Sequence, residues 1–215
     1  MQLVIGNKNY SSWSLRAWLL PAVHNIAFEE IRIPLGTKVT KSEILRYSKA
    51  GKVPVLYDGD VVVWDSLAIL EYISEQYLDG KGWPDDVSMR AEARSCCAEM
   101  HSGFFTLRED MPMNCRAKGR QVLISENLQK DITRVDDIWS ALREKYSEKG
   151  PWLFGLFSIA DCMFAPVVFR FQTYGVTVSE TSRMYMETVL SEQRVKDWLR
   201  AGEEETEKIE VAEVG

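Results

Sequence analysis

The chain has 215 residues, of which 46% are apolar and 11% aromatic, enough to bury a core in one large or two small domains. The net charge of −6 is spread without long blocks of either sign before the last dozen residues, which argues against nucleic acid and anionic membranes as partners. The 4 cysteines lack C-x-x-C and metal-ligand spacing and only 2 histidines accompany them, so no disulfide framework, metal site or dithiol redox centre is expected.

The start of the chain shows no targeting pattern. Residues 1–6 lack a basic segment followed by a long apolar run, and no stretch approaches ~18 uncharged apolar residues. We therefore expect a cytoplasmic protein that has no membrane-spanning segment.

Strand and helix patterns alternate in the first part of the chain. Residues 2–6 form an apolar run that ends in glycine, and residues 13–24 are too densely apolar for a surface strand, which predicts strand, turn and helix. Residues 28–35 alternate apolar and charged side chains, as a half-exposed strand does. A short helix is expected next, because Thr40 and Glu43 have the spacing of a capping box.

A β-hairpin and a helix are predicted to follow. Residues 53–57 and 61–64 are apolar and flank a turn at Gly59, where glycine supplies the backbone angles that the turn needs. Asp65 and Ser66 can cap the apolar helix that begins there. The predicted order is β-α-β-α-β-β-α.

Strand patterns disappear after a connector between Leu78 and Val87 that is rich in glycine and aspartate and contains a proline, so a domain boundary is expected there. The chain then has a helical pattern up to about Lys149. We expect one helical segment that ends near Asp110 and another that begins near Arg116, with a break between them.

The remaining helices are predicted from a second capping pattern and from apolar spacing. Ser158 and Asp161 form a capping box before a helix that is apolar enough to be central, and Pro166 lies in its early part. A last helix is expected around residues 195–199. The acidic tail, residues 203–215, is expected to be partly disordered.

Four short motifs occur in order along this pattern: Asn9–Ser14, Lys52–Val55, Trp64–Ile69 and Phe157–Asp161. Together with the element order, they make the chain resemble the cytosolic glutathione transferase family, and the serine-rich turn is most similar to that of the zeta class and its bacterial relatives. The resemblance implies an α/β thioredoxin-like domain that binds glutathione and an all-α helical domain with a second-substrate pocket. The boundaries expected for these parts are 1–80, 88–202 and, for the acidic tail, 203–215.

The resemblance also implies that a hydroxyl group activates the thiol of glutathione. An unperturbed thiol has a pKa near ~8.5, so few of these groups are thiolate at neutral pH. A serine hydroxyl can donate a hydrogen bond to sulfur, and a helix start adds free N–H groups and the positive end of its dipole; a shift of about two pKa units needs roughly 2.7 kcal/mol. By position in the family's motif, Ser11 is the predicted donor, Ser12 and Tyr10 are alternatives, and the serines could instead be helix caps only.

The other glutathione contacts follow from the same resemblance. It implies a cis peptide bond between Val53 and Pro54, with the backbone of Val53 paired to the cysteinyl part of the tripeptide. It assigns the γ-glutamyl carboxylate to Ser66, at the start of a helix, and places Asp65 near the amino group, although both residues are good caps without any ligand. The glycyl carboxylate is assigned to one of two lysines, Lys38 or Lys52.

The second substrate is expected to be an apolar electrophile that lies against Trp13 and the first long helix of the back half. The residues predicted to face it at helical spacing are His101, Phe104, Phe105 and Arg108, with Met111 at the helix end. Arg108 beside aromatic rings suits a substrate carboxylate or a developing negative charge, and a structural salt bridge is the alternative.

The function implied by the resemblance is that of a glutathione S-transferase, a homodimer that takes part in detoxification by adding glutathione to electrophiles. A glutathione-dependent cis-trans isomerase of a maleylacetoacetate-like diacid is the alternative, although Trp13 stands where that class commonly has a cysteine. A non-catalytic member that uses the fold for assembly or ligand carriage is a third possibility.

Overall fold

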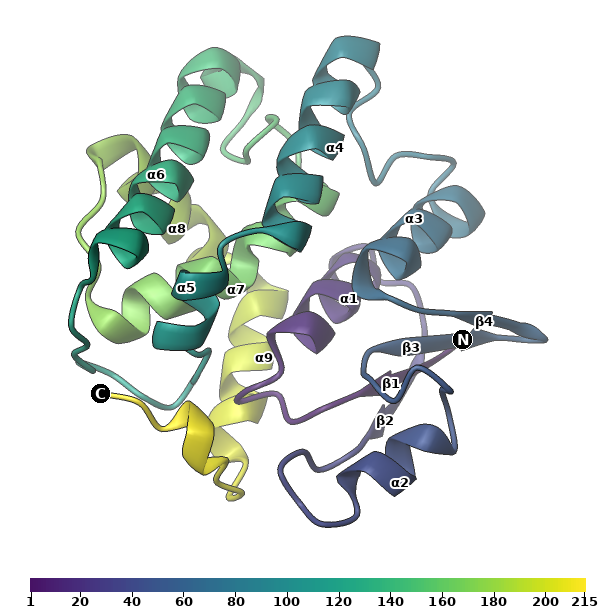
Figure 1. The fold of residues 1–215 in the computed structure, drawn as a ribbon. Coiled ribbons are helices and arrows are strands. Elements are labelled where there is room, and N and C mark those ends of the chain that lie inside the picture. The colour runs from purple at the N-terminus through teal and green to yellow at the C-terminus, as the bar shows by residue number, and fades with distance from the viewer.

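The computed structural model describes all residues, 1–215, as a mixed sheet with helices followed by helices alone (Figure 1). The first part contains β1 (Gln2–Ile5), α1 (Ser12–Val23), β2 (Glu29–Arg32), α2 (Thr40–Leu45), β3 (Val55–Asp58), β4 (Val61–Val63) and α3 (Ser66–Tyr77). The second part contains α4 (Val87–Ser102), α5 (Phe105–Asp110), α6 (Glu126–Tyr146), α7 (Ile159–Tyr174), α8 (Glu180–Ser191) and α9 (Gln193–Glu204), with single 3₁₀ turns η1 (Ser147–Lys149) and η2 (Glu210–Ala212). The predicted fold class, α/β followed by all-α, is confirmed.

The sheet has the strand order β2-β1-β3-β4, with β1 parallel to β2 and β3 antiparallel to both of its neighbours. Side chains that alternate along β1 separate two apolar layers, because successive residues of a strand point to opposite faces. Leu3 and Ile5 belong to the large core that contains α1 and α3, whereas Val4 packs with Ile44 of α2 in a small second cluster. The sheet is therefore covered on both faces.

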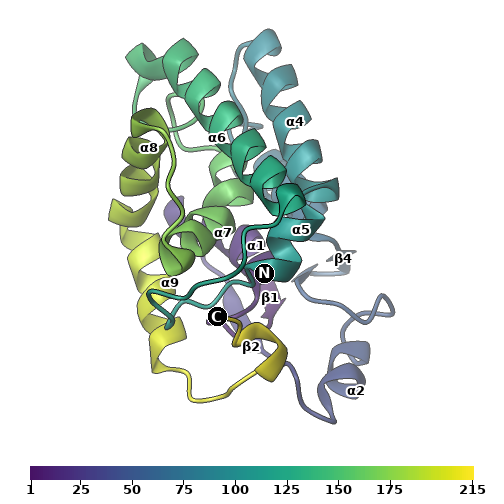
Figure 2. The same cartoon turned by 60° about the vertical axis from the view of Figure 1, so that its left-hand side comes forward.

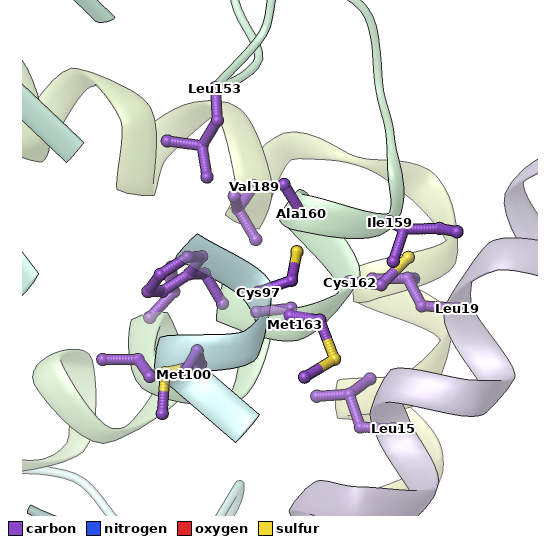
Figure 3. Packing of buried hydrophobic residues seen from close by; sticks show 14 of the residues in the cluster. Leu15, Leu19, Cys97, Met100, Leu153, Ile159, Ala160, Cys162, Met163 and Val189 are labelled. Carbon is purple, nitrogen blue, oxygen red and sulfur yellow. The ribbon is translucent and has the colours of Figure 1, made fainter. Parts of the chain in front are cut away.

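The large core is continuous between the two parts of the chain. Helix α1 packs against α3 on one side and against α7 on the other. Figure 3 shows Leu15 and Leu19 of α1 beside Met163 and Cys162 of α7, with Cys97 of α4 nearby. Because these side chains are fully or almost fully buried, α1 is fixed from both sides, and its first turn has a defined position.

The helix expected to continue to about Asp110 is interrupted, which corrects the sequence prediction. Helix α4 ends at Ser102, Gly103 is extended, and Phe104 adopts the left-handed conformation with a φ of 59° before α5 begins. A Cβ atom on Gly103 would lie 2.9 Å from the carbonyl oxygen of Glu99, so glycine is required at this break.

The second expected helix begins ten residues later than predicted, at Glu126 instead of about Arg116. The backbone of the preceding segment pairs with other parts of the molecule: Cys115 N–H donates to the carbonyl of Asn9, and Arg120 N–H donates to the carbonyl of Thr173. The helix itself starts where the hydroxyl group of Ser125 accepts a hydrogen bond from Leu128 N–H.

The two predicted capping boxes have different outcomes. The box formed by Ser158 and Asp161 at the start of α7 is present. At α2 it is absent, because the hydroxyl group of Thr40 bonds to Thr37 N–H and to the carbonyl of Pro34 instead of to the helix. The tight turn before α2 therefore uses the side chain that the sequence pattern assigned to the helix.

The acidic tail is ordered, contrary to the expectation of partial disorder. After α9 the chain turns back beside β2 and the β1–α1 turn (Figure 2). The carboxylate of Glu207 pairs with Arg32 at 2.8 Å, and that of Glu213 pairs with Arg120 at 2.7 Å. These two carboxylates of the charge run are thus paired with arginines from other parts of the chain, which composition alone does not reveal.

Candidate active site

A cleft of about 550 Å³ lies where the sheet half meets α4. Its lining comes from the serine-rich turn, the loops around α2, the start of β3, the start of α3 and the end of α4: Tyr10, Ser11, Ser12, Trp13, Leu35, Ile44, Ala50, Lys52, Val53, Pro54, Trp64, Asp65, Ser66 and His101. Three of the four sequence motifs therefore meet around one cavity.

Ser11 immediately precedes α1 and makes no capping hydrogen bond to the helix. Its hydroxyl oxygen lies 2.7 Å from that of Ser14, which accepts a hydrogen bond from Gly6 N–H. When Ser14 is the donor of this pair, the hydrogen of Ser11 is free to bond a ligand in the cleft. The arrangement argues against the alternative that Ser11 is only a cap.

Ser12 is the first residue of α1 and is partly exposed in the cleft. Its hydroxyl oxygen accepts a hydrogen bond of 3.3 Å from Nη2 of Arg170, so its own hydrogen is also free to donate. The first intrahelical bond of α1 runs from Leu15 N–H to the carbonyl of Ser11. The N–H groups of the preceding turn therefore have no partner within the helix, and the positive end of the helix dipole lies at these serines.

Tyr10 lines the cleft, but its hydroxyl group is bound elsewhere. It donates a 2.5 Å hydrogen bond to the carboxylate of Glu213 and accepts one of 2.7 Å from Arg116. Burial and the Glu213 carboxylate raise the pKa of Tyr10. Of the three sequence candidates for the thiol donor, Tyr10 is thus the one whose hydroxyl group already has strong partners.

The start of α3 contributes two polar side chains. Asp65 caps the helix through a 3.1 Å bond from Leu67 N–H, and its other oxygen lies 2.9 Å from Nε2 of His101. The hydroxyl group of Ser66 is buried and has no hydrogen-bond partner. Because buried polar atoms are almost always paired, the oxygen of Ser66 is unusual in having no partner within the chain, and it lies at the lining of the cleft.

The loop before β3 provides the opposite wall. The Val53–Pro54 peptide bond is cis, as the resemblance implied, and the Trp64–Asp65 bond is cis as well. Lys52 lies exposed on the cleft lining, whereas Lys38 is exposed and does not line it. Of the two lysines considered for the glycyl carboxylate, the structure brings only Lys52 to the site.

Trp13 lies in the centre of a group of cationic and aromatic side chains. The guanidinium groups of Arg16 and Arg108 lie 4.4 Å and 4.8 Å from the centre of its indole ring, and the imidazole of His101 packs against it at 5.3 Å. These contacts hold Trp13 at the edge of the cleft by cation–π and edge-to-face interactions.

Three arginines near the serine turn form no ion pair: Arg16 and Arg108 lie on the ring of Trp13, and Arg170 bonds to Ser12. Arg16 and Arg170 are fully buried, and Arg108 is partly buried; burial lowers the pKa of all three, and the neighbouring guanidinium groups lower it further for Arg16 and Arg170, to about 10 for Arg170. Their charges are stabilised by backbone carbonyls: Arg108 donates to Met100 and His101, and Arg170 to Met111. The region next to Ser12 is consequently electropositive.

Several residues predicted for the second-substrate pocket lie outside the cleft. Phe105 is 73% exposed, whereas Phe104 and Met111 are buried in the core. The break at Gly103 rotates these side chains away from the face that an uninterrupted helix would present. Arg108 reaches the site only through Trp13 and the carbonyl groups at the end of α4.

Some lining residues and one supporting arginine have weak signals in the sequence or none. Leu35, Ile44 and Ala50 resemble ordinary core residues, and no sequence signal distinguishes them. Trp64 directly precedes the cap residue of a helix, where a large apolar side chain is unusual, so the sequence could have marked it as a lining residue. In the structure its side chain is 57% exposed. Arg170 lies within an otherwise apolar helix, which marks it as a buried charge with a specific partner.

Another hollow, of about 620 Å³, lies over the start of α6 and is lined mostly by polar residues between Ile124 and Asp137. It contains none of the four motifs. No helix of the structure has the length and apolar character needed to cross a membrane.

Family models match both parts of the chain: the glutathione S-transferase N-terminal domain over residues 10–76 and the glutathione S-transferase C-terminal domain over residues 125–201. The chain belongs to the glutathione S-transferase family. The resemblance to this family that the four motifs indicated is therefore confirmed.

Proteins similar to this glutathione S-transferase family member carry several different descriptions, as three examples show. A stringent starvation protein A homolog of Histophilus somni is 23% identical over 76% of this chain and 77% of its own length. A probable maleylacetoacetate isomerase of Caenorhabditis elegans is 33% identical over 43% of this chain and 44% of its own length. The solved structure of a maleylpyruvate isomerase, a bacterial zeta-class glutathione S-transferase, has a TM-score of 0.74 at 20% identity and covers 96% of this chain and 100% of that one. At this identity the structural similarity shows the fold alone.

Proposed function

We propose that the chain is an enzyme that binds glutathione in the cleft and activates its thiol with the hydroxyl group of Ser11 for attack on an apolar electrophile. The observation that carries the proposal is the meeting of the serine turn, the Val53–Pro54 loop and the start of α3 around one cavity of about 550 Å³. Residues 1–80 would hold the tripeptide, and residues 88–202 would complete the second-substrate side.

The residues of the cleft fit the parts of glutathione. The unpartnered hydroxyl group of Ser66, at the start of α3, suits the γ-glutamyl carboxylate, because a helix start also offers N–H groups to an anion. The carboxylate of Asp65 suits the amino group, and Lys52 suits the glycyl carboxylate. The backbone of Val53 would pair with the central cysteinyl residue, whose sulfur would then point to the serine turn.

Ser11 acts in this proposal as a hydrogen-bond donor, not as a base. The thiol proton leaves to solvent, the hydroxyl group of Ser11 stabilises the thiolate, and the sulfur forms a bond to the electrophilic carbon while the leaving group departs or the substrate takes up the charge. The dipole of α1 and the charge of Arg170 behind Ser12 favour the anion further. For a shift of about two pKa units, these contributions together must favour the thiolate by roughly 2.7 kcal/mol.

Binding and turnover can be measured separately. We expect the purified chain to bind glutathione in a calorimetric titration and to conjugate it to 1-chloro-2,4-dinitrobenzene, a generic aromatic electrophile. Binding without conjugation of any electrophile would favour the non-catalytic reading, and a folded chain that does neither would refute the proposal.

The arginines beside Trp13 and Ser12 support a second candidate, a glutathione-dependent cis-trans isomerase of a maleylacetoacetate-like diacid. Arg170 bonds to Ser12, and Arg16 and Arg108 lie behind the cleft on the ring of Trp13, all three without an acidic partner. Their combined positive charge suits a dianionic substrate better than a neutral one. An Arg108→Met variant separates the candidates. Isomerisation of a diacid should fall at least about tenfold, whereas conjugation of a neutral electrophile should change much less.

A homodimer is proposed as well, from the resemblance to the family. Sedimentation of the purified chain tests it, and a mass of one chain would contradict it.

A further inference from the structure

The segment after α9 contacts the turn that carries Ser11, and no sequence pattern predicts this contact. The Glu205 carboxylate accepts hydrogen bonds from two consecutive backbone N–H groups, 2.8 Å from Lys8 and 3.1 Å from Asn9. Only 9% of the Glu205 side chain is exposed. A charged acceptor that satisfies two adjacent N–H groups fixes both the position and the orientation of that backbone.

Helix α9 holds the same turn from a second direction. The indole N–H of Trp198 donates a 2.9 Å hydrogen bond to the carbonyl of Lys8. A Cβ atom on Gly202 would lie 3.2 Å from both the nitrogen and the Cα atom of Asn9, so glycine lets the helix approach this backbone closely. The two peptide groups around Lys8 and Asn9 are thus paired with residues of the C-terminal segment.

Backbone hydrogen bonds within the turn connect Lys8 and Asn9 to the serines that follow them. The N–H groups of Tyr10 and Ser11 donate to the carbonyl of Asn7, and Ser12 N–H donates to the carbonyl of Tyr10. The side chain of Asn7 accepts a hydrogen bond from Leu35 N–H on the cleft wall. A displacement of Asn9 therefore moves the hydroxyl groups of Ser11 and Ser12 relative to the cleft.

We propose that residues 198–205 are a positioning element for the thiol-activating turn, with Glu205 as its principal positioning residue. The proposal rests on the proposed function, because the serines matter for catalysis only if they bind the thiol. Glu205 does not line the cleft; its carboxylate also lies 3.5 Å from Nη1 of Arg32, and it acts on the turn through the backbone of Lys8 and Asn9. Its loss should raise the pKa of the bound thiol and lower kcat, with a smaller effect on KM for glutathione.

The Glu205→Gln variant is the sharpest test, because it keeps the shape of the side chain and replaces one acceptor oxygen by an amide NH₂ that faces a backbone N–H. Glu204→Gln is the matched control, since the side chain of Glu204 is exposed and makes no hydrogen bond or ion pair. We expect Glu205→Gln to lower kcat about tenfold and the control to leave it unchanged, with both variants folded at 25 °C.

Backbone amide hydrogen exchange of residues 7–12 without glutathione gives a readout that does not depend on the proposed function. We expect faster exchange in this turn for Glu205→Gln and unchanged exchange in β3. If Glu205→Gln does not fold, Gly202→Ala serves as the second variant, because it displaces the same backbone by a few tenths of an ångström. It should also lower kcat and speed up amide exchange in the turn, both to a smaller extent.

The outcomes separate the two proposals. Unchanged exchange of the turn, or an unchanged kcat and thiol pKa beside a wild type that does activate glutathione, would overturn the role of Glu205. A wild type that never binds glutathione would refute the proposed function, and faster exchange in the variant would then still support Glu205 as the anchor of the turn.

Discussion

Nε2 of His101 lies 2.9 Å from Oδ2 of Asp65, and this contact joins the last turn of α4 to the first turn of α3. The two helices belong to different parts of the chain, so the helical half helps to shape the wall of the cleft. Asp65 uses its other oxygen to cap α3, so the same carboxylate bonds both to its own helix and to α4.

Removing this imidazole should weaken glutathione binding. We expect His101→Ala to raise KM for glutathione about threefold with little change in kcat, because a partly exposed pair contributes less than about 1 kcal/mol and acts on the γ-glutamyl end, away from the sulfur. His24→Ala is the control, since His24 is exposed and lies outside the cleft. Steady-state kinetics with varied glutathione measure the effect; a fall in kcat at constant KM would contradict it.

The capping box of α7 should contribute strongly to stability. The buried carboxylate of Asp161 accepts hydrogen bonds from the N–H groups of Ser158 and Leu153 and from the hydroxyl group of Tyr185. Asp161→Ala leaves these donors buried and unpaired, so we expect the free energy of unfolding to fall by about 3 kcal/mol or more. Urea unfolding measures the loss.

Asp137→Ala provides the reference for this measurement, because Asp137 is an exposed residue of α6. Its substitution should change the free energy of unfolding by less than about 0.5 kcal/mol. Equal losses for the two variants would show that the hydrogen bonds of Asp161 do not stabilise the start of α7.

Docking of the acidic tail should depend on pH. Burial opposes ionisation of Glu213, but the hydrogen bond from Tyr10 and the charges of Arg120 and Arg116 outweigh it and lower the pKa of Glu213. A hydrogen bond from its own backbone N–H, and then the one from Arg32, lower the pKa of Glu207. Both pKa values are lower in the folded chain than in the unfolded one, so the two ionised carboxylates stabilise the folded chain. This stabilisation is complete above the ordinary glutamate value near 4.5 and is lost as the pH falls through the lowered values.

The comparison of Glu213→Gln with wild type tests this dependence. The variant should be the less stable of the two at about pH 7, and the difference should shrink towards about pH 3.5 as the wild-type carboxylate takes up a proton. Glu210→Gln, at an exposed position of the same tail, should show no difference at either pH. A difference between Glu213→Gln and wild type that stays constant over this range would show that ionisation of Glu213 does not hold the tail.

The element order and the three motifs that line the cleft could be predicted from the sequence, because their signals are local. A glycine turn between apolar strands, Asp65 at a helix start and a serine-rich turn before an apolar helix each lie within a few residues. The same holds for the capping box of Ser158 and Asp161.

The surroundings of Trp13 and the path of the C-terminal segment could not be predicted, because they depend on contacts between distant residues. Helical spacing placed Phe104 and Phe105 beside His101, and the left-handed backbone at Phe104 breaks that relation. The contacts of Glu205 with Lys8 and Asn9 join positions almost 200 residues apart. An acidic tail has the composition of a disordered segment, and only the folded chain shows which N–H groups and arginines meet its carboxylates.

The central claim, that Ser11 stabilises the thiolate of glutathione, is tested most directly by titrating the bound thiol through its ultraviolet absorbance. In the wild type we expect the pKa of the bound thiol to lie about two units below that of the free thiol, and Ser11→Ala should raise it by at least about one unit. Ser12→Ala should have a smaller effect and Tyr10→Phe none. A bound thiol that titrates in Ser11→Ala as it does in the wild type would contradict the account.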